Sequence, residues 1–205
     1  KKKSDYYDSL KTTKPNELWC ADVTIFKTAD NVKHYIHFLI DHFSKYVIGY
    51  KICSSSSSFA IKELLQSAYK KHKPYKLQFL TDGGSENVNT TVSNFIDNPD
   101  VPIEHIIAQK DVVFSNSMVE ALNKVIKHQF LFPKDIANTN QLHKILEQSV
   151  KIYNNLRPQM SLSGNTPKET FNGIPIDISK YTQNFKEQKV LRRQLNKKNT
   201  CKACL

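Results

Sequence analysis

The sequence predicts an α/β domain built on a mixed five-stranded sheet with helices on both faces. Apolar segments occur in the order of three strands, a helix, and then alternating strands and helices. The links between the first three strands are short, which is typical of an antiparallel meander. The later strand–helix alternation indicates parallel strands covered by helices. A chain of 205 residues is long enough to bury the core that such a sheet requires.

Five segments have strand-like patterns. Residues 18–26 alternate between two faces, residues 34–43 form a nearly continuous apolar run, and residues 46–52 are rich in β-branched and aromatic residues. Two shorter apolar segments, 76–81 and 103–107, follow later in the chain. The first three segments therefore predict the meander, and the last two predict the strands of the alternating units.

Four segments have helical spacing. Apolar residues recur at helical intervals in 59–72, which follows a serine run suited to capping and ends before Pro74. The other helices are expected over 88–96, 116–130 and 140–155. Alternation with the later strands places these helices against the sheet.

The net charge of +11 is concentrated at the two ends of the chain. Residues 180–205 carry eight Lys or Arg against one acid, and residues 1–14 carry five Lys against two acids. The segment between them has a net charge of +1. Basic extensions on a nearly neutral core favour a long polyanion such as nucleic acid as the partner, because each neutralised phosphate releases counterions. The alternative is that the charges only keep the protein soluble.

We expect three parts: a basic N-terminal extension (1–15), a folded core (16–175) and a basic C-terminal extension (176–205). The boundary near 175 is placed where helical and strand periodicity fades. No apolar run approaches the roughly 20 residues of a membrane helix, so no membrane partner is expected. An intracellular location is expected, since four irregularly spaced cysteines do not form a disulfide framework. Cys201 and Cys204 form half of a zinc motif, and coincidence is the favoured explanation.

Asp22 and Asp82 lie within or at the end of predicted strands, at positions where a carboxylate can bind a metal or a ligand. Asp22 shares one face of its strand with Cys20 and Thr24, and a carboxylate in a central strand is costly to bury unless it is paired or metal-bound. Asp82 follows a strand at its carboxyl end and precedes two glycines, which allow close approach of a ligand. The alternatives are an edge strand with Asp22 in water, and an Asp-Gly turn of purely conformational origin.

Glu120 lies on a helix whose polar face also carries basic residues. At 3.6 residues per turn, Glu120, Asn123, Lys124 and Lys127 point in nearly one direction. This face combines a metal-binding carboxylate with two lysines that can hold a DNA backbone. The alternative is a solvated face with an ordinary Glu–Lys pair. The opposite face is apolar and consists of Met118, Val119, Leu122, Val125 and Ile126.

In order and spacing, Asp22, Asp82 and Glu120 resemble the acids of the DDE catalytic core of retroviral integrases and insertion-sequence transposases, which has a ribonuclease-H-like fold. The likeness covers roughly residues 16–173. Thirty-seven residues separate Asp82 from Glu120, slightly more than is usual in the family. The motifs that carry the likeness to the family are Trp19-x-x-Asp22-Val-Thr, the run from Tyr35 to Gly49 with its Asp41-x-x-Ser44 turn, Thr81-Asp82-Gly83-Gly84-Ser85-Glu86, Tyr153-Asn154-x-x-Arg157-Pro158, and Thr166-Pro167-Lys168-Glu169-x-Phe171.

Besides the spacing between Asp82 and Glu120, the sequence departs from the family at Gly83. Gly83 stands where many members of the family have Asn, which can alter a contact near the site. Asp41 and Glu86 are acids at a turn position and just past the second catalytic acid, and they are not expected to be catalytic.

The resemblance implies a metal-dependent polynucleotidyl transferase that cleaves DNA at the ends of a mobile element and joins them to target DNA. It implies two Mg²⁺ (or Mn²⁺) ions per site held by Asp22, Asp82 and Glu120, with Asp22 bridging both. It also implies a dimer or larger homo-oligomer, in a bacterial cytoplasm or a eukaryotic nucleus. The alternatives are a nuclease of the same fold that never joins DNA, and a DNA-binding protein that has lost the chemistry. The DNA contacts are expected at Lys124, Lys127, Arg157, Arg192 and Arg193.

Overall fold

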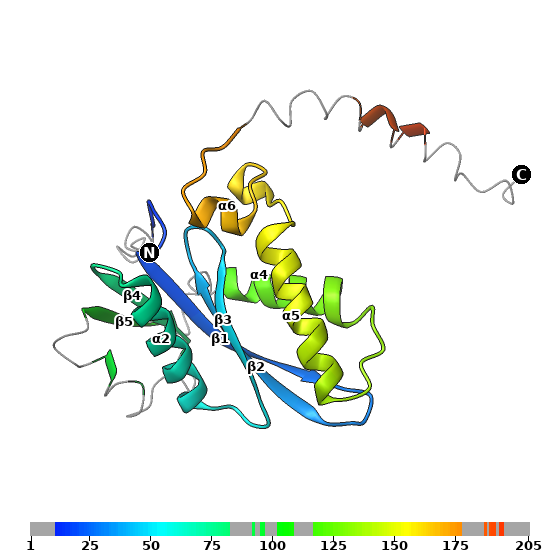
Figure 1. The fold of residues 1–205 in the computed structure, drawn as a ribbon, viewed down its shortest axis with the longest axis horizontal. Helices are drawn as coiled ribbons and strands as arrows, with labels where there is room; N and C mark the ends of the chain where they lie inside the picture. The colour runs from blue at the N-terminus through cyan, green and yellow to red at the C-terminus, as the bar shows by residue number, and fades with distance from the viewer. Residues whose placement is uncertain are drawn as a thin grey trace, which may run out of the picture.

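The computed structural model describes residues 11–82, 92, 95–96, 102–108, 117–177, 187, 189–191 and 193–194. Its centre is a single five-stranded sheet with the strand order β3-β2-β1-β4-β5 (Figure 1). The predicted meander and the mixed five-stranded sheet are confirmed, since β1–β2 and β2–β3 are antiparallel and β1–β4 and β4–β5 are parallel. The strands are β1 (Leu18–Lys27), β2 (Lys33–Asp41), β3 (Val47–Cys53), β4 (Leu77–Thr81) and β5 (Ile103–Ile107).

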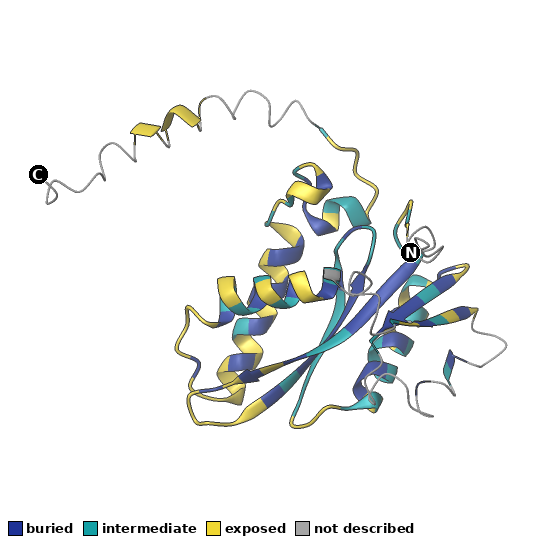
Figure 2. Cartoon of the chain, turned by 180° about the vertical axis from the view of Figure 1, so that it is seen from behind, coloured by how far each residue is buried: buried dark blue, intermediate teal, exposed yellow. Residues whose placement is uncertain are grey.

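Strand β1 is the middle strand and has a neighbour on each side. It pairs with β2 from Trp19 opposite Asp41 to Lys27 opposite Lys33, and its first half also pairs with β4. Burial is continuous through its first four residues (Figure 2). The alternative in which β1 is an edge strand is therefore wrong.

Helices cover both faces of the sheet, as predicted (Figure 1). Alternate residues of a strand point to opposite faces. Trp19 and Ala21 of β1 belong to a core that includes α2, whereas Leu18 and Cys20 belong to a second core that includes the other helices. Among the described residues, no helix is both long and apolar enough to cross a membrane. The helices on the two faces are α2 (Ser58–His72) on one, and α4 (Ser117–Val125) and α5 (Thr139–Asn155) on the other.

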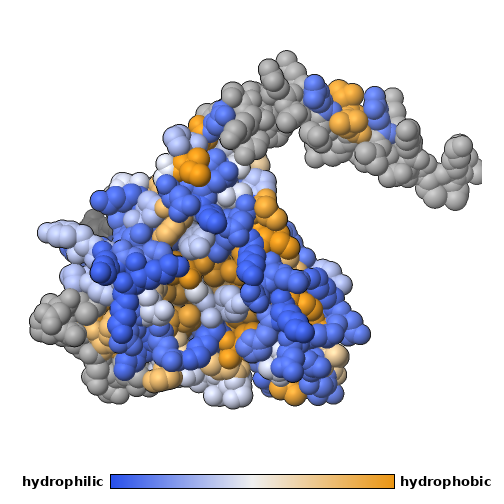
Figure 3. All heavy atoms as spheres, viewed as in Figure 1, coloured by the Kyte–Doolittle hydropathy of each residue, from blue (hydrophilic) through white to orange (hydrophobic). Residues whose placement is uncertain are grey.

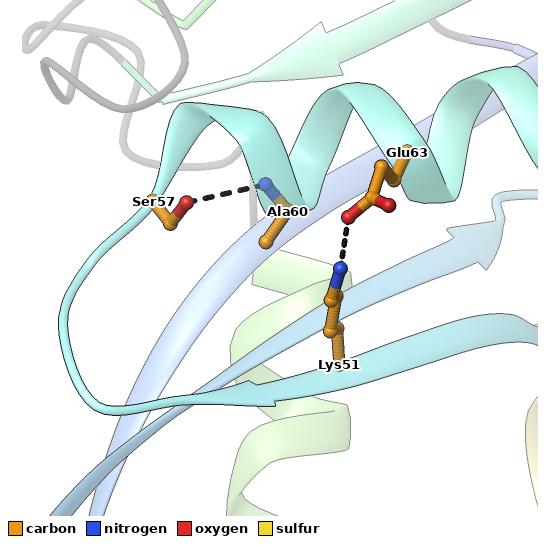
Figure 4. Close-up of polar contacts among 4 residues, drawn as sticks. All are labelled: Lys51, Ser57, Ala60 and Glu63. Carbon is orange, nitrogen blue, oxygen red and sulfur yellow. Dashed lines mark hydrogen bonds and ion pairs between the residues drawn. The ribbon is translucent and has the colours of Figure 1, made fainter.

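Helix α2 begins where the serine run predicts a cap. The Ser57 side chain accepts a hydrogen bond from the backbone N–H of Ala60 at 3.3 Å (Figure 4). An ion pair between Lys51 of β3 and Glu63 of α2 joins the helix to the sheet edge. The helix ends at Lys73, which adopts the left-handed conformation with a φ of 45°.

The helix predicted over 116–130 changes type after α4. Residues Ile126–Leu131 form the π-helix η1, and Phe132 donates its backbone N–H to the carbonyl of Lys127 at 2.8 Å. Five residues advance about 140° beyond a full turn in an α-helix. The wider i→i+5 winding reduces this offset, so Ile126 and Leu131 can both be buried. Lys127 lies in this π-helix, so the helical wheel with 3.6 residues per turn does not give the direction of its side chain.

The segment after α5 packs against α5 and the turn between β2 and β3. It contains η2 (Met160–Leu162) and α6 (Pro167–Phe171), which the helical spacing did not predict. Helix α6 begins with a capping box between Thr166 and Glu169. Its last residue, Phe171, stacks on Tyr46 with ring centroids 4.6 Å apart.

Asn154 near the end of α5 completes the exposed edge of the sheet. Its side-chain oxygen accepts from the backbone N–H of Val47 at 3.0 Å, and its Nδ2 donates to the Val47 carbonyl at 2.9 Å. Because β3 is an edge strand, these outward backbone groups have no strand partner on that side. The amide of Asn154 thereby replaces two bonds of a missing neighbour strand.

We predict that Asn154→Ala lowers the free energy of unfolding by about 2–4 kcal/mol, since two buried backbone groups lose their partners. Asn155→Ala is the matched control, because the neighbouring Asn155 is exposed. Urea denaturation followed by circular dichroism measures both variants. Equal losses of stability in the two variants would contradict the role assigned to the Asn154 bonds.

Candidate active site

Asp22 lies midway along β1 and is half-buried. Its Oδ1 accepts a hydrogen bond from the Val23 backbone N–H at 2.8 Å, and its Oδ2 accepts from Asn123 Nδ2 at 2.9 Å. The second bond joins the central strand to helix α4 across 101 positions of the sequence. Asn123 therefore fixes the direction in which the Asp22 carboxylate points.

The register between β1 and β4 brings Asp82 next to Asp22. Trp19 pairs with Phe79 and Cys20 with Leu80 in a parallel ladder, and each acid lies two positions further along its own strand direction. Neighbouring strands are about 4.8 Å apart. Since Cys20 and Leu80 both belong to the core beneath α4, strand alternation directs both acids toward that helix.

The backbone immediately before Asp82 is anchored by β5 and the residue that follows it. Thr81 Oγ1 forms a hydrogen bond with His105 Nε2 at 2.9 Å, and the Thr81 carbonyl accepts from the Ala108 N–H at 2.7 Å. The His105 ring also stacks on Phe79 with centroids 5.5 Å apart. Sequence reasoning missed this anchor, because nothing in the local pattern around His105 indicates its partner.

Glu120 lies in the first turn of α4 and is exposed, one helical turn before Asn123. Val119 and Leu122 bury the opposite face of the helix in the core, as the helical wheel predicts. Asn123, which the wheel placed beside Glu120, is the residue that contacts Asp22. Within the described ranges, no three His, Cys, Asp or Glu side chains lie close enough together to hold a metal ion. The catalytic role of the three acids stays a prediction.

The donor chemistry around Asp22 suits a hard cation. Carboxylates are the ligands that Mg²⁺ prefers. Asn123 Oδ1 is buried and finds no hydrogen-bond partner in the part of the chain that the structure describes, so it adds an uncommitted oxygen beside Asp22. Burial raises the pKa of the Cys20 thiol, which keeps the neighbouring sulfur protonated and unsuited as a metal ligand.

Asp41 has a structural role in the turn between β2 and β3. It is fully buried, and burial raises the pKa of its carboxyl. The carboxylate accepts hydrogen bonds from the Asn16 N–H at 2.7 Å, the Ser44 N–H at 2.8 Å and the Ser44 hydroxyl at 2.6 Å. These bonds close the β2–β3 turn and tie it to the segment before β1.

The predicted DNA-contacting residues have different surroundings. Lys124 on α4 is exposed, and Lys127 in η1 is half-buried. Arg157 donates from Nε to Gln129 Oε1 at 3.1 Å, which joins the segment after α5 to η1. Arg193 is exposed and helical. Arg192, Cys201 and Cys204, and with them the prediction about zinc, lie outside the described residues.

A mixed sheet with two acids side by side on its central parallel strands, and a third acid on the facing helix, defines the class of ribonuclease-H-like proteins to which integrases and transposases belong. Two family models, both described as "Integrase core domain", match residues 12–110 and 103–167. The chain belongs to the integrase core domain family.

Curated relatives are transposases of bacterial insertion sequences. The chain is 27% identical over 161 residues to the "Putative transposase InsK for insertion sequence element IS150" of Escherichia coli (strain K12), covering 78% of this chain and 56% of the relative. It is 25% identical over 165 residues to the "Transposase for insertion sequence element IS904" of Lactococcus lactis, covering 78% and 63%. The chain thus spans less than two thirds of the length of these relatives.

Retroviral integrases are among the solved structures with the same fold. The HTLV-2 integrase catalytic core domain in complex with magnesium, in its trimeric form, superposes with a TM-score of 0.60 at 19% identity, covering 78% of this chain and 99% of that chain. A simian T-cell lymphotropic virus intasome in complex with a PP2A regulatory subunit gives a TM-score of 0.66 at 18% identity, covering 80% and 58%. The ribonuclease-H-like fold is therefore confirmed.

Proposed function

We propose that this chain is the catalytic core of a DNA transposase, which cleaves DNA at the ends of a mobile element and joins those ends to target DNA. The observation that carries the proposal is the β1–β4 register, in which Cys20 pairs with Leu80 on the face beneath α4, two positions before Asp22 and Asp82 respectively. The insertion-sequence transposases among the relatives support the same reaction.

Asp22, Asp82 and Glu120 would hold two Mg²⁺ or Mn²⁺ ions, which would stabilise charge on the attacking and leaving oxygens of a phosphodiester exchange. The oxygen-rich donor set supports this proposal, as does the magnesium named for the HTLV-2 core. Attack by water gives a cleaved end with a free 3′-OH. Attack by that 3′-OH on a second phosphodiester joins the two DNAs and releases another 3′-OH.

The chain's own residues would orient the reacting groups. Asn123 holds one oxygen of Asp22, so that the carboxylate keeps a fixed direction when DNA binds. Thr81, fixed through its hydroxyl and its carbonyl, limits the movement of the backbone that carries Asp82. Lys124, exposed on α4, and Lys127, half-buried in η1, would bind phosphates of the substrate.

The partners that we propose are the element ends, the target DNA and further copies of this chain. Two element ends must be held together for transposition, which requires at least two active sites in one assembly. The HTLV-2 core in its dimeric and trimeric forms supports association of such domains. The proposed location is intracellular, where DNA is available. Arg157, Arg192 and Arg193 are proposed as additional DNA contacts.

We predict that Asp22→Asn, Asp82→Asn and Glu120→Gln each reduce Mg²⁺-dependent cleavage by more than the roughly 100-fold that is typical of losing a supporting residue. DNA affinity should change less than threefold in a binding assay that contains Ca²⁺ instead of Mg²⁺, because the tails and lysines remain. Retained cleavage and joining in Asp82→Asn would refute the assignment. The full-length protein and labelled element-end DNA are the materials for both measurements.

The two alternatives are separated by a strand-transfer assay with pre-cleaved ends. A transposase joins such ends to a plasmid in the presence of Mg²⁺. Cleavage without joining would identify a nuclease of the same fold, and DNA binding without either reaction would identify an inactive DNA-binding protein.

We also predict that Asn123→Ala lowers the cleavage rate about 10- to 100-fold, which is the usual effect of removing a residue that orients a ligand. The side chain is only half-buried, so the free energy of unfolding should change by less than about 1 kcal/mol. Ala121→Ser, at an exposed position of the same helix, is the control. An Asn123→Ala variant with normal kcat would show that Asp22 does not need this hydrogen bond.

A further inference from the structure

A pair of adjoining grooves lies at the end of the sheet opposite the acids. The first, of about 410 Å³, is formed by residues 11–17 before β1 together with residues 74–76 and 78 at the start of β4. The second, of about 790 Å³, lies between the end of α2 and Pro102. Pro74 and Tyr75 line both grooves, so the two form one continuous surface. Hydrophilic side chains predominate on the face seen in Figure 3.

The paired grooves are strongly basic. The first is lined by Lys11, Lys14 and Lys76, and the second by Lys70 and Lys73. All five lysines are exposed. They come from two segments that meet at the grooves, and the mutual repulsion of their like charges is relieved when a polyanion binds.

The acid that lines the first groove is already engaged by its own segment. Glu17 accepts hydrogen bonds from the Thr13 N–H at 2.6 Å, the Lys14 N–H at 3.3 Å and the Thr13 hydroxyl at 3.0 Å. The Thr13 N–H bond is the main reason that the pKa of the Glu17 carboxyl is lowered. This carboxylate closes the turn before β1 and leaves the lysines to set the sign of the local potential.

Tyr75 stands between the two grooves with 97% of its surface exposed. Its neighbour Pro74 is buried, which fixes the backbone beneath it. A tyrosine in this position adds nothing to the core, but it offers a flat aromatic face among lysines. Exposed aromatic rings within basic grooves are the stacking sites of proteins that bind single-stranded nucleic acid.

This surface is separate from the candidate active site. Lys76 immediately precedes β4, whereas Asp82 immediately follows it. The five residues of β4 span about 16 Å at 3.3 Å per residue. A strand that contacts Tyr75 is thus a different stretch of DNA from the phosphate held between the acids.

We propose that these grooves bind single-stranded DNA, with the five lysines contacting phosphates and an unpaired base stacked on Tyr75. This goes beyond the proposed catalytic function and does not depend on it. The site is indifferent to sequence, since stacking and phosphate contacts are available to every nucleotide. It would hold an unpaired strand away from the acids while another stretch of DNA reacts.

The test uses the full chain with Asp82→Asn in EDTA, so that failure of catalysis has no influence on the result. A 12-nucleotide oligonucleotide carrying 5-iodouracil is bound and irradiated, and the crosslinked residue is identified by mass spectrometry. The crosslink is expected at Tyr75 and should disappear in Tyr75→Ala, with Tyr75→Trp crosslinking in its place. Crosslinks confined to residues 1–10 and 176–205, outside the grooves, would overturn the proposal.

Binding is then measured by fluorescence anisotropy with the same oligonucleotide unmodified and with a duplex of equal length. Tyr75→Ala should weaken single-strand binding about 5- to 150-fold, the equivalent of one lost stacking contact, and leave duplex binding within threefold. Equal weakening of single-strand and duplex binding would overturn the proposal that a base stacks on Tyr75.

The salt dependence of single-strand binding tests the lysines of the grooves. The double variant Lys73→Gln/Lys76→Gln should reduce the slope of log K against log salt for single strands by about 1.4, at about 0.7 for each phosphate contact. The control is Lys27→Gln/Lys33→Gln, two exposed lysines paired at the far end of the β1–β2 hairpin. An unchanged slope in the Lys73/Lys76 variant, or the same reduction in the control, would overturn the phosphate contacts.

Discussion

The position of β1 between an antiparallel and a parallel neighbour is the constraint on which the rest of the structure depends. A strand with neighbours on both sides and helices over both faces leaves little water for a polar side chain. Asp22 in its middle is half-buried, so hydrogen bonds from the protein or contacts with a ligand replace part of the hydration that its carboxylate loses. The backbone of Val23 and the amide of Asn123 supply part of this requirement. The packing that stabilises the fold thus also holds the Asp22 carboxylate in one orientation.

The same constraint explains the helix that covers this face. Asn123 has to reach β1, while Val119, Leu122 and Ile126 fill the core beside it. An α-helix continued to residue 131 would turn Leu131 away from that core. The π-helix η1 returns Leu131 to the core side of the helix. Its i→i+5 winding is seen in the hydrogen bond from the Phe132 N–H to the Lys127 carbonyl. π-Helical segments are frequent next to functional sites, and this one follows directly after the helix that carries Glu120.

Local patterns predicted what depends on local physics. The five strands, the cap of α2 and the apolar face of α4 follow from alternation, serine placement and helical spacing, and each is found within a few residues of its expected bounds. The π-helix was not predicted, because a wheel assumes one winding throughout. Helix α6 is five residues long, too short to show a period, and Phe171 on Tyr46 helps hold it in place. The pairs Asn123–Asp22 and His105–Thr81 join distant segments, and no local pattern encodes such partners.

The fold brings together lysines that are far apart in the sequence. The nearly neutral middle of the chain suggested that DNA is held largely by the basic ends. Folding, however, gathers Lys11 and Lys14 from one segment with Lys70, Lys73 and Lys76 from another, while Glu17 is turned inward to its own backbone. The basic N-terminal segment and the nearly neutral middle of the chain therefore form together a basic surface at one end of the sheet, with carboxylates at the other. Phosphates are attracted to the first surface, whereas the carboxylates repel them until cations are bound. Metal binding at the acids would thus decide when DNA can reach the second surface.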